Sequence, residues 1–351
     1  MRLHSAPGLI LVATIMAACT PAAVSSTTPS AGPTPPAATA SAGPVLPVIT
    51  PDKAIAVAKP ARLVTDGTAL WVFSTSGEIS RIDPATNTVS APTMVDPAWT
   101  WGGLGVNAAG LWLGDFDANL VYRIDPVSLA VVAKIPVTAN PDGTGATADA
   151  VWIAQHRGGS VTRIDPATNA VETIIVGTPG PGGPHEIGFG TGSVWVSAGL
   201  SATGSGGGVV RIDPATKKVL ASIPMPANAS ACGGFAFSDQ AVWMASCGDQ
   251  PVLVRIDPLT NQVVATVDLG GYGSYPVLID GVPWLTVQKT DAGADPSRLV
   301  RIDPATNRID RVLSLGDTFQ GEVLLLAFGS VWVTDWPNNQ VLRLPLAAFG
   351  S

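Results

Sequence analysis

A stretch of seven amino acids recurs along the chain and limits the possible fold more than any other feature. It reads Arg-Ile-Asp-Pro-Ala-Thr-Asn at residues 81–87 and returns, complete or altered, further along. The later copies begin at Arg123, Arg163, Arg211, Arg255, Arg301 and, in a decayed form, Arg343. Neighbouring copies begin 40 to 48 residues apart. The chain is therefore built from seven similar units.

A tryptophan between aliphatic residues precedes each copy. These tryptophans are Trp71, Trp112, Trp152, Trp195, Trp243, Trp284 and Trp332. The side chains around them alternate as they would on short β-strands. Repeats of about 40 to 50 residues made of strands are typical of β-propellers. We therefore predict an all-β, seven-bladed β-propeller with four antiparallel strands in each blade.

The recurring segment itself predicts the hairpin turn between the third and fourth strands of a blade. Its proline presets the φ angle of the turn, its aspartate accepts hydrogen bonds from the following amides, and its asparagine tolerates the left-handed conformation. A metal-binding role for these aspartates is the weaker interpretation. A residue that recurs in six of the seven units serves the scaffold.

The two ends of the repeat array complement each other. The seventh unit stops shortly after Leu344 and leaves little chain for an outermost strand, whereas Lys53–Ala58 precedes the first inner strand. We expect Lys53–Ala58 to complete the last blade, which would leave the ring without a free end.

The N-terminal residues have the pattern of a targeting segment. Arg2 precedes the apolar run Leu9–Ala18, which is too short to span a bilayer stably. Residues 15–19 resemble a bacterial lipobox, which implies lipidation of Cys19 and an anchor at the outer face of the cell membrane. An ordinary signal peptide cleaved nearby is the alternative. Residues 20–50, without a charged side chain, predict a disordered Ala/Pro/Ser/Thr tether, and residues 51–351 the propeller.

Charge and cysteine content narrow the chemistry further. The net charge is −7 and the basic residues are scattered, which argues against nucleic-acid binding. We expect a monomer.

Cys232 and Cys247 flank the inner hairpin of the fifth unit, at opposite or nearly opposite positions of paired strands. Because disulfides persist outside the cytoplasm, we expect a bond between them. Two free thiols are the alternative.

The repeat motifs resemble known bacterial propellers. Val-Trp-Val, Val-x-Arg-Ile-Asp-Pro-Ala-Thr-Asn and Val-Val-Ala-Thr-Val are similar to YVTN-type and NHL-like repeats and to the propeller of the virginiamycin B lyase (streptogramin lyase) family. The resemblance implies the fold, because these motifs belong to the scaffold. That family's lyase uses two histidines and a glutamate with magnesium. The equivalent positions here are Gly233, Tyr275 and Gln288, so its catalytic pattern is not carried over.

Residues that break the repeat gather on one face of the predicted disc. Aligned on the tryptophans, the units begin their inner strands at Ala61, Gly102, Asp142, His185, Gly233, Tyr275 and Glu322. Four of these seven are polar and should meet at the mouth of the central channel. The next position adds Arg62 and Glu186. A few convergent polar groups in a pocket are the usual mark of a binding site.

Aromatic residues and histidines outside the repeat map to the same face. Trp99, Trp101 and Trp336 suit a flat apolar or sugar-like ligand, although they would equally pack the loops or plug the channel. His156 and His185 would form a metal site with Asp142 or Glu186, but they lack a ligand spacing such as His-x-His.

We predict a surface-tethered, extracytoplasmic module that binds a small molecule, a glycan or an envelope protein through this face, without a cofactor. Its membrane contact would be the lipid anchor alone. A lyase or hydrolase with a divalent metal, magnesium being possible, at Asp142, His185, Glu186 and Glu322 is one alternative, less favoured than a non-enzymatic role. A structural envelope-assembly protein is another. The candidate ligand-binding residues are Trp99, Trp101, Asp142, His156, His185, Glu186, Tyr275, Glu322 and Trp336.

Overall fold

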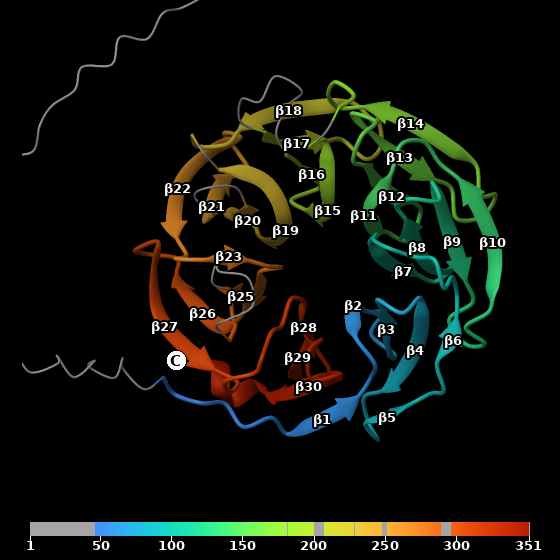
Figure 1. The fold of residues 1–351 in the computed structure, drawn as a ribbon. Helices are drawn as coiled ribbons and strands as arrows, with labels where there is room; N and C mark the ends of the chain where they lie inside the picture. The colour runs from blue at the N-terminus through green and yellow to red at the C-terminus, as the bar shows by residue number, and fades with distance from the viewer. Residues whose placement is uncertain are drawn as a thin grey trace, which may run out of the picture. The chain divides into compact units, whose positions relative to one another are not determined.

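The strands form seven antiparallel sheets placed around a ring, as Figure 1 shows. The computed structural model describes residues 46–180, 182–199, 207–227, 229–247, 251–288 and 296–350. The predicted signal peptide with Cys19, and all but the end of the predicted tether, lie outside these ranges. Within them, no helix is both long and apolar enough to cross a bilayer. The predicted seven-bladed propeller is confirmed.

Blades 1 to 4 each pair strands that follow one another in sequence. Blade 1 contains β2 (Pro60–Thr65), β3 (Leu70–Ser74), β4 (Glu78–Asp83), β5 (Thr88–Val89) and the short β6 (Thr93–Met94). Blade 2 contains β7 (Leu104–Asn107), β8 (Gly110–Asp115), β9 (Leu120–Ile124) and β10 (Val131–Pro136). Blade 3 contains β11 (Pro141–Ala146), β12 (Val151–Gln155), β13 (Ser160–Ile164) and β14 (Val171–Ile175). Blade 4 contains β15 (Pro184–Gly190), β16 (Ser193–Ala198), β17 (Gly208–Ile212) and β18 (Val219–Pro224).

Blades 5 and 6 continue this order, and blade 7 borrows a strand from the other end of the chain. Blade 5 contains β19 (Ser230–Ser238), β20 (Ala241–Cys247), β21 (Val252–Asp257) and β22 (Gln262–Asp268). Blade 6 contains β23 (Tyr272–Gly273), β24 (Val277–Ile279), β25 (Val282–Gln288), β26 (Arg298–Asp303) and β27 (Arg308–Ser314). Blade 7 contains β28 (Leu324–Ala327), β29 (Ser330–Asp335), β30 (Gln340–Pro345) and β1 (Lys53–Ala56), followed by the 3-10 helix η1 (Leu346–Phe349).

Strand β1 closes the ring as predicted. It pairs antiparallel with β30, with Ile55 opposite Val341. The Ile55 side chain is 3% exposed. Residues before the expected boundary at residue 51 also contact the propeller, since Val48 bridges to Ser314 of blade 6 and Ile49 is buried.

Each repeat tryptophan lies opposite a repeat arginine on the neighbouring strand. Trp195 pairs with Arg211, and Trp332 with Arg343. The seven tryptophans are buried. In blades 2, 4, 5 and 7 the guanidinium lies over the indole of its own blade, 5.1 to 5.3 Å from the ring centroid. The motif therefore joins the second and third strands of a blade through their side chains.

The Asp-Pro turns adopt the predicted geometry. Asn169 has a φ of 60°, and the Asp165 carboxylate accepts hydrogen bonds from the amides of Ala167 at 2.8 Å and Thr168 at 3.0 Å. These bonds lower the pKa of Asp165. The aspartate thus stabilises its own turn, as the repeat pattern indicated.

Four of the inner strands carry an irregularity near their first residues. Register shifts occur between Pro60 and Arg62, Pro141 and Thr144, Pro184 and Ile187, and Ala231 and Phe235. Such bulges re-aim side chains and let two successive residues face one way. In blade 5 the bulge moves the backbone of Cys247 opposite Ser230, two positions from Cys232.

Substitution Ile55→Ala should lower the free energy of unfolding by about 2–5 kcal/mol, because it empties a buried site on the strand that closes the ring. Ile175→Ala is the matched control: this isoleucine lies on β14, the outermost strand of blade 3, and is 69% exposed. Its effect should stay within about 0.5 kcal/mol. Urea denaturation measures both, and equal effects would contradict closure by β1.

Candidate functional site

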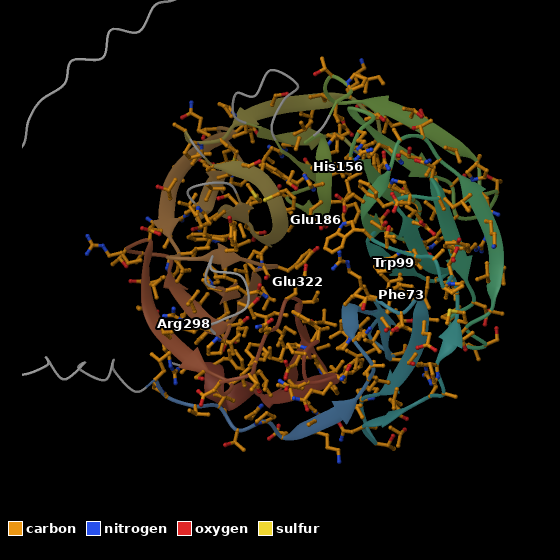
Figure 2. The ribbon with its side chains drawn as sticks, in the orientation of Figure 1. Phe73, Trp99, His156, Glu186, Arg298 and Glu322 are labelled. Carbon is orange, nitrogen blue, oxygen red and sulfur yellow. The ribbon has the colours of Figure 1, made fainter. Side chains whose placement is uncertain are left out.

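Polar side chains from different blades meet at the start of the inner strands. Figure 2 shows Glu186 of β15 and Glu322, just before β28, directed toward the centre of the ring. Arg62 of β2 and Tyr275, between β23 and β24, join them. These contacts connect blades 1, 4, 6 and 7 across the channel.

Arg62 is the central cation of this group. Its side chain is buried, and its Nε donates a hydrogen bond to the Gly102 carbonyl at 3.0 Å. Its Nη1 lies 3.5 Å from Glu322 Oε1. Burial by itself lowers the pKa of Arg62, but the surrounding acidic groups outweigh it and hold that pKa above its ordinary value. Arg62 therefore stays charged and offsets the carboxylates around it.

Trp101 combines exposure with a fixed position. It is 42% exposed. Its Nε1 donates a hydrogen bond to Asp142 Oδ1 at 2.7 Å, and the Arg62 guanidinium lies 4.3 Å from its ring centroid. An exposed aromatic ring held by a hydrogen bond and a cation–π contact presents a rigid surface.

Asp142 and two histidines form a compact cluster beside Trp101. Asp142, on β11, is 3% exposed. Its Oδ2 lies 3.0 Å from His185 Nδ1 and 3.5 Å from His156 Nδ1. The two imidazole rings meet edge to face at 4.2 Å. Burial, reinforced by His185, lowers the pKa of His156 despite the nearby Asp142.

Glu186 and Tyr275 form a second pair in the channel. The Tyr275 hydroxyl donates to Glu186 Oε1 at 2.5 Å. Burial, with the charge of Asp142 added, raises the pKa of Glu186 to about 8, although Arg62 and the Tyr275 hydrogen bond act in the opposite direction. Burial, with the charge of Glu186 added, raises the pKa of Tyr275 well above its ordinary value. At neutral pH this pair is therefore largely protonated.

A cavity of about 490 Å³ lies at the start of β2. The half-exposed Trp101 and Trp336 are among its walls. The residues that line it are Lys59, Pro60, Ala61, Thr75, Trp101, Glu322, Trp336, Pro337 and Asn339. It combines two indole rings with a carboxylate, an amide and a hydroxyl, which suits a ligand with both ring faces and polar groups.

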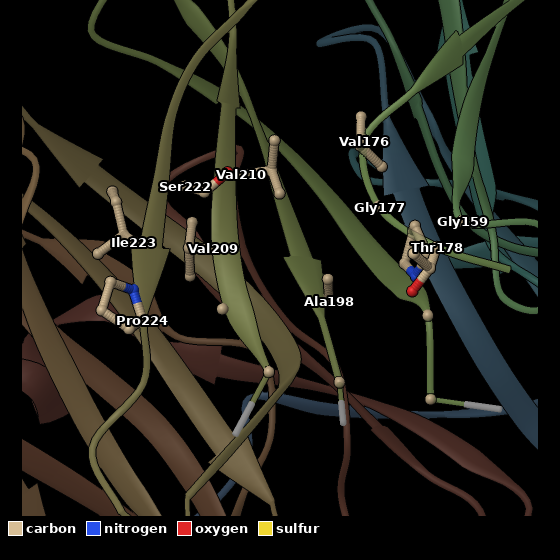
Figure 3. Close-up of a pocket in the computed structure, with 16 residues that line it drawn as sticks. Gly159, Val176, Gly177, Thr178, Ala198, Val209, Val210, Ser222, Ile223 and Pro224 are labelled. Carbon is tan, nitrogen blue, oxygen red and sulfur yellow. The ribbon is translucent and has the colours of Figure 1, made fainter. Parts of the chain in front are cut away.

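Another cavity, of about 270 Å³, lies between strands of blade 4 and the end of blade 3 (Figure 3). Glycines and aliphatic residues such as Val209 and Ile223 dominate its lining. None of its lining residues is ionisable. We therefore place the chemistry at the channel mouth.

The structure brings together all the predicted site residues except Trp99. Trp99 is buried at 5% exposure, with its ring edge-on to Phe73 at 4.8 Å and its Nε1 donating to the Gly114 carbonyl at 2.8 Å (Figure 2). It packs blades 1 and 2 and does not line the mouth. Glu186 contacts Tyr275 and Glu322 contacts Arg62, and neither glutamate belongs to the cluster of Asp142, His156 and His185.

Two contributors were not among the candidates. The alignment of the units placed Arg62 at the mouth of the channel. The sequence feature that pointed to it was its charge, directly after the aligned start of an inner strand. Phe116 stands in the loop after β8, and its ring lies 5.5 Å from that of His156.

Comparison with known proteins identifies the fold. No protein-family model matches the chain, and neither does any curated protein sequence. Hydrazine synthase of Kuenenia stuttgartiensis is 12% identical, with a TM-score of 0.69 over 82% of this chain and 96% of that one. Inactive virginiamycin B lyase of Staphylococcus aureus with quinupristin is 15% identical, with a TM-score of 0.68 over 84% and 98%. BamB from Moraxella catarrhalis is 14% identical, with a TM-score of 0.57 over 80% and 82%.

These similarities confirm the β-propeller and the expected resemblance to the streptogramin lyase propeller. At such low identity they show the fold alone.

Substitution Arg62→Met should lower the free energy of unfolding by about 3 kcal/mol, because it leaves neighbouring acidic groups without their buried cation. Arg308→Met, at the exposed start of β27, is the matched control and should change stability by at most about 0.5 kcal/mol. Guanidinium titration of the folded chain measures both. Equal effects would show that Arg62 carries no special charge role.

The Arg62→Met loss should also grow between pH 6 and pH 9. The folded pKa of Glu186, about 8, lies above its unfolded value of about 4.3, so its stabilising contribution is present at low pH and is lost as the pH rises through the folded pKa. Without Arg62 the folded pKa rises further and the loss becomes larger. If the difference in unfolding free energy between variant and wild type stays constant over this pH range, Arg62 does not lower the pKa of Glu186.

Proposed function

We propose that the propeller binds a small ring-shaped ligand of the saccharide class in the cavity between Trp101 and Trp336. The observation that carries this proposal is the half-exposed Trp101, fixed by Asp142 at 2.7 Å and by Arg62 at 4.3 Å. A surface ring without a ligand-binding role needs no such anchoring. A ligand that stacks on Trp101 meets a surface already ordered and loses less entropy on binding.

The size of the cavity favours a small molecule over a protein partner at this place. Small-molecule pockets usually measure about 300–1,000 Å³, and this cavity of about 490 Å³ falls inside that range. Protein partners generally need flatter and larger contact areas. Glu322, Asn339 and Thr75 supply acceptors and donors for ligand hydroxyls.

The comparisons are compatible with a bound organic ligand. Virginiamycin B lyase, which has a similar fold, was solved with quinupristin. A propeller of this size therefore accommodates such a molecule, although the identity is too low to transfer its substrate or its activity.

A protein partner on the outer rim is a second candidate. Blades 2 to 5 each expose an apolar side chain on their outermost strand, namely Val132, Ile175, Leu220 and Val264. Exposed apolar residues on four successive blades are what an envelope-assembly role would use. Binding of such a partner would not respond to Trp336→Ala.

We also propose that the protein works outside the cytoplasm, held to the outer face of the cell membrane through lipidated Cys19 and stapled by a Cys232–Cys247 disulfide. The lipobox-like residues 15–19 support the anchor. Cys232 on β19 and Cys247 on β20 lie on paired antiparallel strands, which supports the disulfide.

Saturation-transfer NMR with a panel of mono- and oligosaccharides tests ligand binding. At least one saccharide should bind, and Trp336→Ala should weaken it about five- to 150-fold, since stacking on an aromatic side chain contributes about 1–3 kcal/mol. Tyr272→Ala is the matched control, because Tyr272 is similarly exposed but does not line the cavity. Unchanged affinity in Trp336→Ala, or no binding across the panel, would contradict the proposal.

Peptide mapping without reduction, on protein isolated from the membrane fraction of a bacterial host, tests the anchor and the staple. The expected products are a diacylated N-terminal peptide beginning at Cys19 and a peptide pair linked through Cys232 and Cys247. An unmodified N-terminus would overturn the anchor, and alkylation of both thiols before reduction would overturn the disulfide.

A further inference from the structure

Three side chains of the channel mouth point their ligand atoms at one another. They come from separate parts of blades 3 and 4: Asp142 from β11, His156 from the residue after β12, and His185 from β15. One potential ligand atom of each residue lies within 4.8 Å of those of the other two. Among the described residues, these three side chains are therefore close enough to share one metal ion. It shares Asp142 with the hydrogen bond that holds Trp101, but it does not require a saccharide in the neighbouring cavity.

Trp101 orients the carboxylate for this role. Its Nε1 donates a hydrogen bond to Asp142 Oδ1. The other oxygen, Oδ2, faces the two imidazoles, at 3.0 Å from His185 Nδ1 and 3.5 Å from His156 Nδ1. Metal-bound carboxylates and histidines commonly depend on such second partners for their orientation. The carboxylate is thus fixed in advance with one free oxygen toward both histidines.

The surroundings of His156 also hold its ring in place. Its backbone amide donates to the Asn140 carbonyl at 2.9 Å, and its own carbonyl accepts from the Gly183 amide at 2.9 Å. The Phe116 ring packs against it on one side. Its Nδ1 is buried and has no hydrogen-bond partner, although it points at Asp142. A buried nitrogen left without a partner calls for a physical explanation, and an ion between it and the carboxylate supplies one.

We propose that Asp142, His156 and His185 bind one divalent transition-metal ion, of which zinc is the best match. Tetrahedral zinc with bonds of about 2.0–2.1 Å separates its ligand atoms by roughly 3.3 Å, close to the two measured separations. Two imidazole nitrogens and one carboxylate oxygen suit zinc, whereas magnesium prefers oxygen ligands and octahedral geometry. Three protein ligands leave a fourth position for water or a ligand group.

This assignment departs from the expectation of no cofactor and from the divalent-metal set that joined Asp142 and His185 with two glutamates. It selects His156 in place of Glu186 and Glu322, whose carboxylates contact Tyr275 and Arg62. The same three residues without a metal would form a hydrogen-bonded His–Asp–His group. That is the outcome against which the metal is tested.

Isothermal titration of the full, chelator-treated chain with zinc chloride, and separately with magnesium chloride, is the test. Zinc should bind with one ion per chain and magnesium should give no saturable heat. His156→Gln and His185→Gln, each made alone, should abolish zinc binding. Trp101→Phe, which keeps the ring but removes the donor to Asp142, should weaken it about tenfold. Asp149→Asn, an exposed aspartate at the other end of the β11–β12 hairpin, is the control and should bind as the wild type does.

Circular dichroism melts establish that each variant is folded. A crystal of the zinc-treated wild type should give an anomalous peak at the zinc edge between the three side chains, which decides the question even if one variant misfolds. The proposal fails if the wild type binds no zinc, if either histidine variant retains wild-type affinity, or if the anomalous peak lies elsewhere.

Discussion

The contact between a repeat arginine and the turn asparagine of the next blade joins neighbouring sheets at four blade interfaces of the described structure. Arg211 of blade 4 lies over Trp195 of its own sheet and donates to Asn261 Oδ1 of blade 5 at 3.0 Å. Arg123, Arg255 and Arg343 make the same type of bond to Asn169, Asn307 and Asn87 of the following blade. The bond from Arg343 joins blade 7 to blade 1. Residues that look like a local turn motif in sequence therefore also fasten neighbouring sheets.

The candidate site depends on these arginine–asparagine contacts between blades, because the residues of the site come from distant parts of the chain. Arg62 and Glu322 are 260 residues apart, and Tyr275 and Glu186 are 89 apart. Both pairs face each other across the channel because the blades are fixed at their outer turns. The inner ends of the sheets can then carry polar, partly unpaired groups that would weaken an ordinary core.

The periodicity of the sequence was sufficient to predict the blades, the turn conformation and closure by β1. Alignment on the tryptophans also placed Asp142, His185, Tyr275 and Glu322 on one ring, because a repeat transfers position from unit to unit. It did not predict the burial of Trp99, which fills a gap between blades 1 and 2. Nor did it predict the register shift before Phe235 or the pairing of individual side chains. Bulges and cross-channel contacts depend on backbone detail and on residues hundreds of positions apart, which no local pattern encodes.

The bulges at the start of the inner strands free the site residues from a role in strand pairing. Asp142, His185 and Glu186 stand where the ladder is already interrupted, and Arg62 directly follows such an interruption, so strand pairing places little constraint on their identity. The arginine–asparagine contacts at the opposite ends of the blades are unaffected when these site residues are substituted. A lineage of such propellers can therefore change these residues one blade at a time without altering the pairing of the strands. Specificity in this architecture is open to gradual evolution by single substitutions.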